Sequence, residues 1–576
     1  GSGGQYVGLS GFSSAPDCMV MEFFGGGLVE QAAFYYDDPQ YRWLANHWTD
    51  LKWSRGGGYL PMYTDTVGPM EKPNVPATYD GVRILPYDRV SYEWLTDQLR
   101  RNQSYRLPPE PFEKAADRLA FRDDFHSNAA FLYLSTSSHP WAVRPIQNNM
   151  LARFTDLADT WLYTNVKDNS GWVRNLVSIS NGRNYIPRAG CTIEALANLG
   201  EVSAAASREQ GVAGMDWTRT VVHWRGHYFV VLDRMVAQAD DDYVCVCRWR
   251  CPQMAALRDG IWTAMAPSGN RFYIQNTEPL LQTAEYWPID GSGRPYVLQQ
   301  YHQGHLARGT ALTFQNLMYV AGAARPDEFA ARRVTGDALL VKGRTSDGEH
   351  LALIGVNGGI PLADFETDAQ IYHVVGDRLH LAGLTSLKAR IGDAFAEIFH
   401  ADQPVNLLVE CASGAGEIEV RGEAPVRVRA GVAAAKERQP GRGAVVLAAA
   451  GALPRPSAAV AALWDRSAPH VDREAKESSR QPDPFVARIA PTALRRPQQR
   501  LTNARITSTP RPNYEKRTRR TWDSTKDLEI TFSLPESQPL DCLRVIAANT
   551  PPQTVAGRDP TLGEWVGTEG CAHRTN

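Results

Sequence analysis

The chain has 576 residues, of which 43% are apolar and 22% are charged, and both fractions are typical of globular proteins. This composition excludes a disordered chain, a collagen and a long coiled coil. The 61 Lys and Arg residues against 63 Asp and Glu residues give a net charge of −2, which argues against a dedicated nucleic-acid binder. No apolar run reaches the roughly 18 residues of a membrane-spanning helix, so no membrane span is predicted.

Residues 1–118 are predicted to be helices with long connections. In PQYRWLANHW and again in RVSYEWLTDQLRR (89–101), apolar residues recur at the three- and four-residue spacing of an amphipathic helix. Two or three helices cannot enclose much of a core, so we expect the C-terminal part of a larger helical domain. The start, GSGG, has no signal-peptide pattern, which indicates either a processed chain or a piece of a longer protein.

From about residue 119 to residue 450 the apolar period changes to two, which predicts a large antiparallel β-sandwich. The clearest hairpin is DWTRTVVHW-RG-HYFVVLDRM, with Arg225 and Gly226 in its turn. On its first strand, Trp217, Arg219, Val221 and His223 should share one face. A weak helical pattern around 389–399 is the one alternative within this region. The fold class expected is therefore α+β multidomain, a helical part followed by a sandwich.

Three alternating cysteines mark another strand of this region, DDYVCVCRWRC. Cys245, Cys247 and Cys251 should face the same side as Trp249. Because cysteines two apart on one strand are poorly placed to bridge, and no CxxC pair exists, we expect a buried core face and not a disulfide or zinc site.

The C-terminal quarter divides into two parts. Residues 451–500 are rich in Pro, Ala and Arg, which predicts a linker. Residues 501–576 hold the apparent strands LEITFSL and LDCLRVIAAN. The surrounding stretch TWDSTKDLEITFSLPESQPLDCLRVIA is similar to the opening of a discoidin-like, galactose-binding module, so we expect a partial β module here.

Three stretches together resemble the heparinase II/III-like family of polysaccharide lyases. They are FRDDFHSNAAFLYLS, NNMLARFTDLADTWLYTN with the following WVRNLVSIS, and EALANLGEVSAAASREQGVAGMDWTRTVVHWRGHYFVVLDRMVAQADDDYVCVCRWR. The resemblance covers about residues 120–255 and extends plausibly to 450. It implies an α/α toroid ahead of the sandwich, and an extracellular or periplasmic protein that acts on acidic polysaccharides.

The chemistry implied by this resemblance is β-elimination at a uronic acid. A base removes the proton alpha to the carboxylate, a cation or amide neutralises the carboxylate, and an acid protonates the leaving oxygen. Tyr and His usually serve as base and acid in the family. The candidates here are Tyr59, Tyr63, His47 and His139, with ordinary packing as the alternative for each.

The residues expected to bind the substrate are Asn149, Arg174, Asn175 and Trp141. Asn149 matches the family asparagine that begins a strand, and Arg174-Asn175 stands where the family has a His-Asn pair. Arginine suits a uronate because its planar fork matches a carboxylate. Trp141, in the loop between, could offer an apolar plate to a sugar ring.

The chain departs from the family at the positions that hold zinc in some members. These positions read Val143, Pro145, Thr164 and Arg174, none of which is a good zinc ligand. We therefore expect no metal and no other cofactor.

Two further functions remain open from the sequence. The lost family residues favour a non-catalytic protein that binds or organises glycans on the lyase fold. A glycoside hydrolase would need two acids facing one cleft, for which Asp123, Asp124 and Asp233 are candidates.

Overall fold

The structure of the protein is a computed structural model. It describes residues 39, 81–87, 89–101, 107–124, 128–136, 148–163, 174–182, 188–278, 280–286, 296–411, 417–421, 426–428, 436–438, 443–446, 453–467, 505–510, 526–531, 544–549 and 561–566. Tyr59, Tyr63, His47, His139 and Trp141 lie outside these ranges. No helix in the described ranges is long and apolar enough to cross a membrane.

The centre of the fold is a 13-stranded sheet in which every strand pair is antiparallel. Its strands, in spatial order, are β12 (Met254–Arg258), β13 (Ile261–Met265), β14 (Arg271–Asn276), β17 (Ala311–Ala321), β10 (Tyr228–Ala237), β9 (Met215–Trp224), β8 (Val202–Val212), β7 (Cys191–Leu199), β2 (Ala115–Arg122), β3 (Phe131–Ser135), β4 (Met150–Asp156) and β5 (Asp159–Tyr163), with β1 (Gly81–Pro86) beside β2.

A four-stranded sheet packs against one face of this central sheet. It is built from β15 (Leu281–Tyr286), β16 (Tyr296–Leu306), β11 (Asp241–Cys251) and β6 (Val177–Ser180). Cys245, Cys247, Trp249 and Cys251 of β11 point into the core between the two sheets. The predicted cysteine face of this strand is confirmed.

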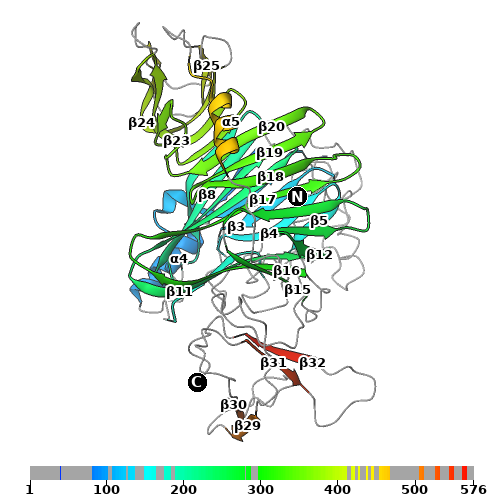
Figure 1. Ribbon diagram of the computed structural model, residues 1–576. Coiled ribbons are helices and arrows are strands. Elements are labelled where there is room, and N and C mark those ends of the chain that lie inside the picture. The colour runs from blue at the N-terminus through cyan, green and yellow to red at the C-terminus, as the bar shows by residue number, and fades with distance from the viewer. Residues whose placement is uncertain are drawn as a thin grey trace.

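An 11-stranded sheet covers the opposite face of the central sheet, and Figure 1 shows the resulting stack of β-layers. Its strands are β18 (Glu328–Thr335), β19 (Ala338–Thr345), β20 (Gly348–Val356), β21 (Phe365–Thr367), β22 (Ile371–Val375), β23 (Arg378–Ile391), β24 (Ala394–Glu410), β25 (Glu417–Arg421), β26 (Val426–Val428), β27 (Lys436–Arg438) and β28 (Gly443–Val446). Helix α5 (Pro456–Arg466) packs on the outer side of this sheet through Val460.

The predicted hairpin forms β9 and β10. Trp224 pairs with Tyr228 across a turn in which Gly226 has a φ of 79°, a backbone conformation that favours glycine. The alternation of β9 is also as predicted, since Trp217 and Val221 lie in the core toward the four-stranded sheet and Trp224 lies in the core toward the 11-stranded sheet.

The antiparallel β-rich architecture is confirmed, and two details differ from the prediction. The helical alternative at 389–399 is wrong, because these residues form the end of β23, the start of β24 and the short turn between them at Gly392. The strands also form three stacked sheets in place of a single sandwich, because both faces of the central sheet are apolar and each needs a cover.

Outside the three sheets, the described residues include two α-helices and two separate strand pairs. Helix α4 (Arg89–Arg100) forms where RVSYEWLTDQLRR predicts it. The toroid itself stays a prediction. Helix α5 lies at the start of the stretch predicted as a linker, and two strand pairs follow in the C-terminal part: β29 (Arg505–Pro510) with β30 (Lys526–Thr531), and β31 (Arg544–Asn549) with β32 (Thr561–Val566).

Candidate functional site

Asn149 immediately precedes β4 and is completely buried. Its side-chain amide donates to the backbone oxygen of Ser207 at 3.2 Å and accepts a hydrogen bond from the Ser207 hydroxyl. Its φ of 53° lies in the left-handed region, which asparagine tolerates better than most residues. The amide therefore fixes the start of β4 to β8.

Asn175 precedes β6 and is buried equally well. Its Nδ2 donates to Leu151 O at 3.0 Å, and its Oδ1 accepts from the backbone N–H of Arg250 at 2.5 Å. Leu151 N in turn donates to Asn175 O at 2.9 Å. Since β4 belongs to the central sheet and β11 to the four-stranded sheet, this one side chain joins the two layers.

A buried ion pair lies directly between these two strand starts. Arg219 of β9 donates through Nη1 to Asn149 O at 2.6 Å and to Asn175 O at 3.1 Å. Its Nε and Nη2 donate to the two carboxylate oxygens of Asp233 at 2.7 and 2.8 Å, the bidentate geometry that makes arginine–carboxylate pairs strong. Both side chains have no exposed surface.

Aromatic rings enclose this pair. The Arg219 guanidinium lies 5.3 Å from the ring of Trp217 and 5.2 Å from the ring of Trp249. The Trp217 indole N–H also donates to Asp233 at 2.8 Å. The Arg219–Asp233 pair is the residue pair that the sequence reasoning missed as part of the site. The sequence pointed to this pair in one way: each strand of the hairpin has a charged residue, Arg219 or Asp233, among apolar residues of its core face.

Three arginines gather around the same segment. Arg174 precedes Asn175, the Asn175 side chain binds the Arg250 backbone, and the Arg248 backbone N–H donates to Leu176 O at 3.1 Å. Residues 174–176 thus lie alongside residues 248–250. Arg248 and Arg250 alternate with the core cysteines and point to the other side of β11.

These arginines are buried, with exposed fractions of 1–3%. Arg248 donates from Nη1 to the Ser178 hydroxyl at 2.6 Å and from Nε to Gln299 Oε1 at 3.2 Å. The structure therefore places Asn149, Arg174 and Asn175 on neighbouring segments. It buries them instead of placing them on an open cleft wall.

A groove of about 790 Å³ lies where α4 meets the sandwich, lined by that helix, by residues 110–113 and by Gln210. Three carboxylates (Glu93, Glu110, Glu113) face two arginines (Arg89, Arg100) in it, which gives a polyanion little attraction. Burial, and then the charges of Glu110 and Glu113, raise the pKa of Tyr92, the opposite of what a tyrosine base needs.

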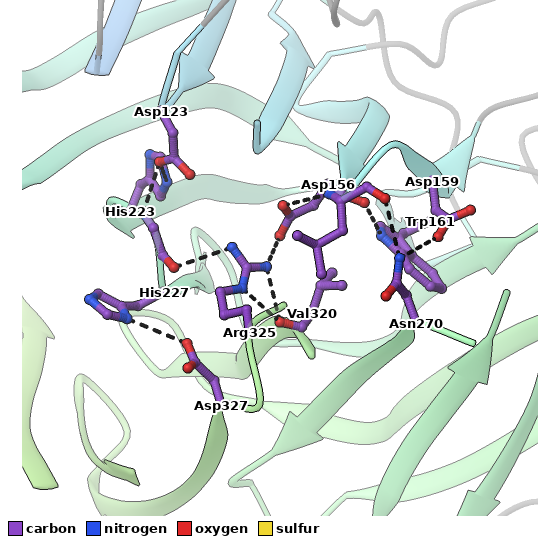
Figure 2. Close-up of polar contacts among 12 residues, drawn as sticks. Asp123, Asp156, Asp159, Trp161, His223, His227, Asn270, Val320, Arg325 and Asp327 are labelled. Carbon is purple, nitrogen blue, oxygen red and sulfur yellow. Dashed lines mark hydrogen bonds and ion pairs between the residues drawn. The ribbon is translucent and has the colours of Figure 1, made fainter. Parts of the chain in front are cut away.

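Two of the acids considered for a hydrolase, Asp233 and Asp123, are engaged in contacts within the fold. Both carboxylate oxygens of Asp233 accept hydrogen bonds from Arg219. Asp123 lies at the end of β2, where its Oδ1 is 2.9 Å from His223 Nε2 and accepts from Gly226 N at 3.0 Å (Figure 2). Burial alone would raise the pKa of Asp123, but the charge and hydrogen bond of His223, with Gly226 N–H and Arg325, hold it below its usual value.

Arg325 joins this corner to the next carboxylate. Its guanidinium donates to Gly226 O at 3.2 Å, and Figure 2 shows it between Val320 and Asp156. Burial raises the pKa of Asp156 to about 6 even though Arg325 pairs with it. His223 in turn stacks on Phe229 with 3.9 Å between ring centroids. These contacts tie strand ends together, so we assign the corner a structural role.

The described residues contain no group of three or more His, Cys, Asp or Glu side chains placed to hold a metal ion. Of the zinc-related positions named above, only Arg174 falls in the described ranges.

The known proteins that match this chain are found among solved structures, and they match it in fold. No family profile and no curated protein matches the chain. Among solved structures, heparan sulfate lyase HepC from Pedobacter heparinus aligns with 11% identity and a TM-score of 0.38, covering 58% of this chain and 48% of that chain. A heparinase III structure aligns with 9% identity and a TM-score of 0.39, covering 59% of this chain and 49% of that chain.

The chain has fold-level similarity to heparinase III and heparan sulfate lyase. The aligned part spans about half the length of those two structures.

Proposed function

We propose that this protein is a polysaccharide lyase-like protein that acts on acidic, uronate-containing glycans. The observation that supports this most directly is that residues 174–176 lie alongside residues 248–250, which brings Arg174, Arg248 and Arg250 onto segments next to Asn175. A uronate needs a cation and an amide within hydrogen-bond reach, and these segments carry residues of both kinds. The resemblance of the sequence to the heparinase II/III-like family points to the same ligand, and to an extracellular or periplasmic location.

Catalysis by β-elimination would require a base and an acid in addition to this carboxylate site. Tyr59, Tyr63, His47 and His139 remain the candidates for these roles, and Trp141 the candidate for the sugar platform. Arginine stays protonated at any physiological pH, so Arg174 can neutralise a carboxylate but cannot remove the proton.

The burial of the arginines has a kinetic consequence. A uronate must replace the present partners of guanidinium groups that are 1–3% exposed. Binding that requires such a rearrangement is slow, so we expect an association rate constant below the ~10⁵ M⁻¹ s⁻¹ that is usual for rigid partners.

The test measures binding and cleavage of alginate, heparan sulfate and chondroitin-type polymers by wild type and Arg174→Ala. The proposal expects the wild type to bind at least one of these polymers, and the variant to bind it at least about tenfold more weakly, because it loses a charged hydrogen bond to the carboxylate. The exposed Arg258 of β12 supplies the matched control, and Arg258→Ala should bind like the wild type.

The ultraviolet absorbance of the unsaturated uronate product distinguishes the two forms of the proposal. Product formation identifies a lyase. Binding without product identifies the second candidate, a glycan-binding protein on the lyase fold, which is favoured by the replacement of a family histidine by Arg174. If the wild type binds none of these polymers, or Arg174→Ala binds as well as the wild type, the proposed site is wrong.

A further inference from the structure

A row of histidines lies between the central sheet and the 11-stranded sheet. Four of the 13 histidines of the chain are in it: His227 in the β9–β10 turn, His350 on β20, His373 on β22 and His380 on β23. Trp224 of β9 packs against three of them, with ring centroids 4.2 Å from His227, 4.9 Å from His350 and 6.2 Å from His373. The glycan proposal uses none of these residues.

His373 is the member of this row that bridges the two sheets. Its Nε2 is 2.9 Å from the hydroxyl of Tyr228, which lies on β10 of the central sheet. The His373 side chain is 1% exposed, and its Nδ1 has no hydrogen-bond partner. A neutral imidazole satisfies the contact to Tyr228 with either tautomer. A protonated ring would bury a charged Nδ1–H with nothing to accept it.

The charged groups around the row lie nearer to the other histidines. Glu201, in the β7–β8 turn, is 3.6 Å from His380 Nε2 and 3.0 Å from Arg378, which also pairs with Glu410. Asp327 is 3.4 Å from His227 (Figure 2). Asp347 and Asp327 act electrostatically on His350. His380 contacts His373 through the backbone, since its Nδ1 is 3.1 Å from His373 O.

We propose that His373 is an acid-sensitive latch between the two sheets: its neutral ring bonds Tyr228 across the interface, and its protonation loosens the 11-stranded sheet from the central sheet. The latch would respond to acidification of the surroundings of the protein. Loss of the contact would expose the apolar surface around Trp224, Tyr228 and Phe329.

The direction of the pH dependence follows from the shifted pKa values. Burial, and then the charge of His380, hold the pKa of His373 well below 6.5. Burial, and then the charge of His227, lower the pKa of His350 as well. Each ring is neutral in both states above pH 6.5, so its contribution is complete there. Below pH 6.5 the unfolded chain takes up the proton first, and stability falls.

The carboxylate at the edge of the row acts in a different pH window. The His380 ring, whose Nε2 is 3.6 Å away, lowers the pKa of Glu201 to about 2 from 4.5. Its contribution is complete above pH 4.5 and is lost only as the pH falls toward 2. Acidification between about pH 7 and about pH 5 therefore tests the histidines separately from this carboxylate.

The experiment compares the melting temperature of the full chain at about pH 7 and about pH 5 in wild type and His373→Gln. Glutamine can keep a hydrogen bond to Tyr228 and has no proton to gain. The wild type should lose about 2–3 °C more than the variant, the shift expected for one such histidine in a fold of this size. His305→Gln is the control, because His305 on β16 is 64% exposed and lies outside the row; this variant should lose as much as the wild type.

A second measurement does not depend on any variant folding. Imidazole resonances of wild type, followed from about pH 8 to about pH 5, should include one ring that stays neutral until the two sheets separate, with a simultaneous change in Trp fluorescence. The latch is refuted if every imidazole titrates near its ordinary pKa while the chain stays folded. It is equally refuted if His373→Gln folds and melts with the same pH profile as the wild type.

Discussion

At the scale of single residues, the Arg219–Asp233 pair connects two strand starts inside the core. It has no solvent exposure, and its guanidinium also holds the backbone oxygens of Asn149 and Asn175. Removing one partner of such a pair leaves an uncompensated charge in the core. The candidate site is built on the two strand starts that this arginine joins.

We predict that Asp233→Asn lowers the free energy of unfolding by about 3–5 kcal/mol. Chemical denaturation of the variant measures this loss. The control is Glu366→Gln, which removes the exposed 3.4 Å ion pair with Lys388 and should cost no more than about 1 kcal/mol. Equal, small losses in both variants would show that Asp233 is not needed to neutralise Arg219.

At the scale of strands, the β18–β19 pair depends on a glycine for space. Gly343 is paired with Phe329, and a Cβ at Gly343 would lie 2.0 Å from the Phe329 ring. The ring cannot move away easily, because Tyr228 and Tyr319 each pack edge-on against it with centroids 5.2 Å apart. An aromatic ring over a cross-strand glycine is a recognised means of fixing strand register.

We predict that Gly343→Ala destabilises the protein by about 1–3 kcal/mol through overpacking. Thermal or denaturant unfolding measures the loss. Gly359→Ala is the matched control, since no atom lies within 4 Å of a Cβ there, and its effect should stay within about 0.5 kcal/mol. A neutral Gly343→Ala would mean that Phe329 has room to shift.

At the scale of the whole molecule, the central sheet is shared by two cores. One core lies between it and the four-stranded sheet, and the other lies between it and the 11-stranded sheet. Neither outer sheet can leave without exposing one apolar face of the central sheet. The three layers should therefore unfold together.

We predict one calorimetric transition for the stacked sheets near neutral pH. The near-ultraviolet signal of the buried tryptophans should disappear at the same temperature as the β-sheet signal, because Trp161, Trp217, Trp249 and Trp262 lie in one core and Trp224 in the other. Two separated transitions, with the sheet signal lost in two steps, would show that the layers are independent units.

The sequence by itself determined the local pattern of this protein. Period-two alternation predicted the hairpin of β9 and β10 and assigned Trp217 and Trp224 to opposite faces, because side chains of a strand alternate whatever they pack against. The same rule placed the cysteines of β11 in the core. The helical spacing at residues 89–101 predicted α4 for the same reason, since it is a property of one segment.

Only the tertiary structure decided which segments meet. Alternation says that β9 has two buried faces, but it does not say that separate sheets cover them. The burial of Asn149, Arg174 and Asn175, and their connection through Arg219, depend on contacts between residues up to 75 positions apart. The contact of His373 with Tyr228 spans 145 positions. Such contacts depend on how the sheets stack, and the sequence of a single segment does not specify which other segments it will contact.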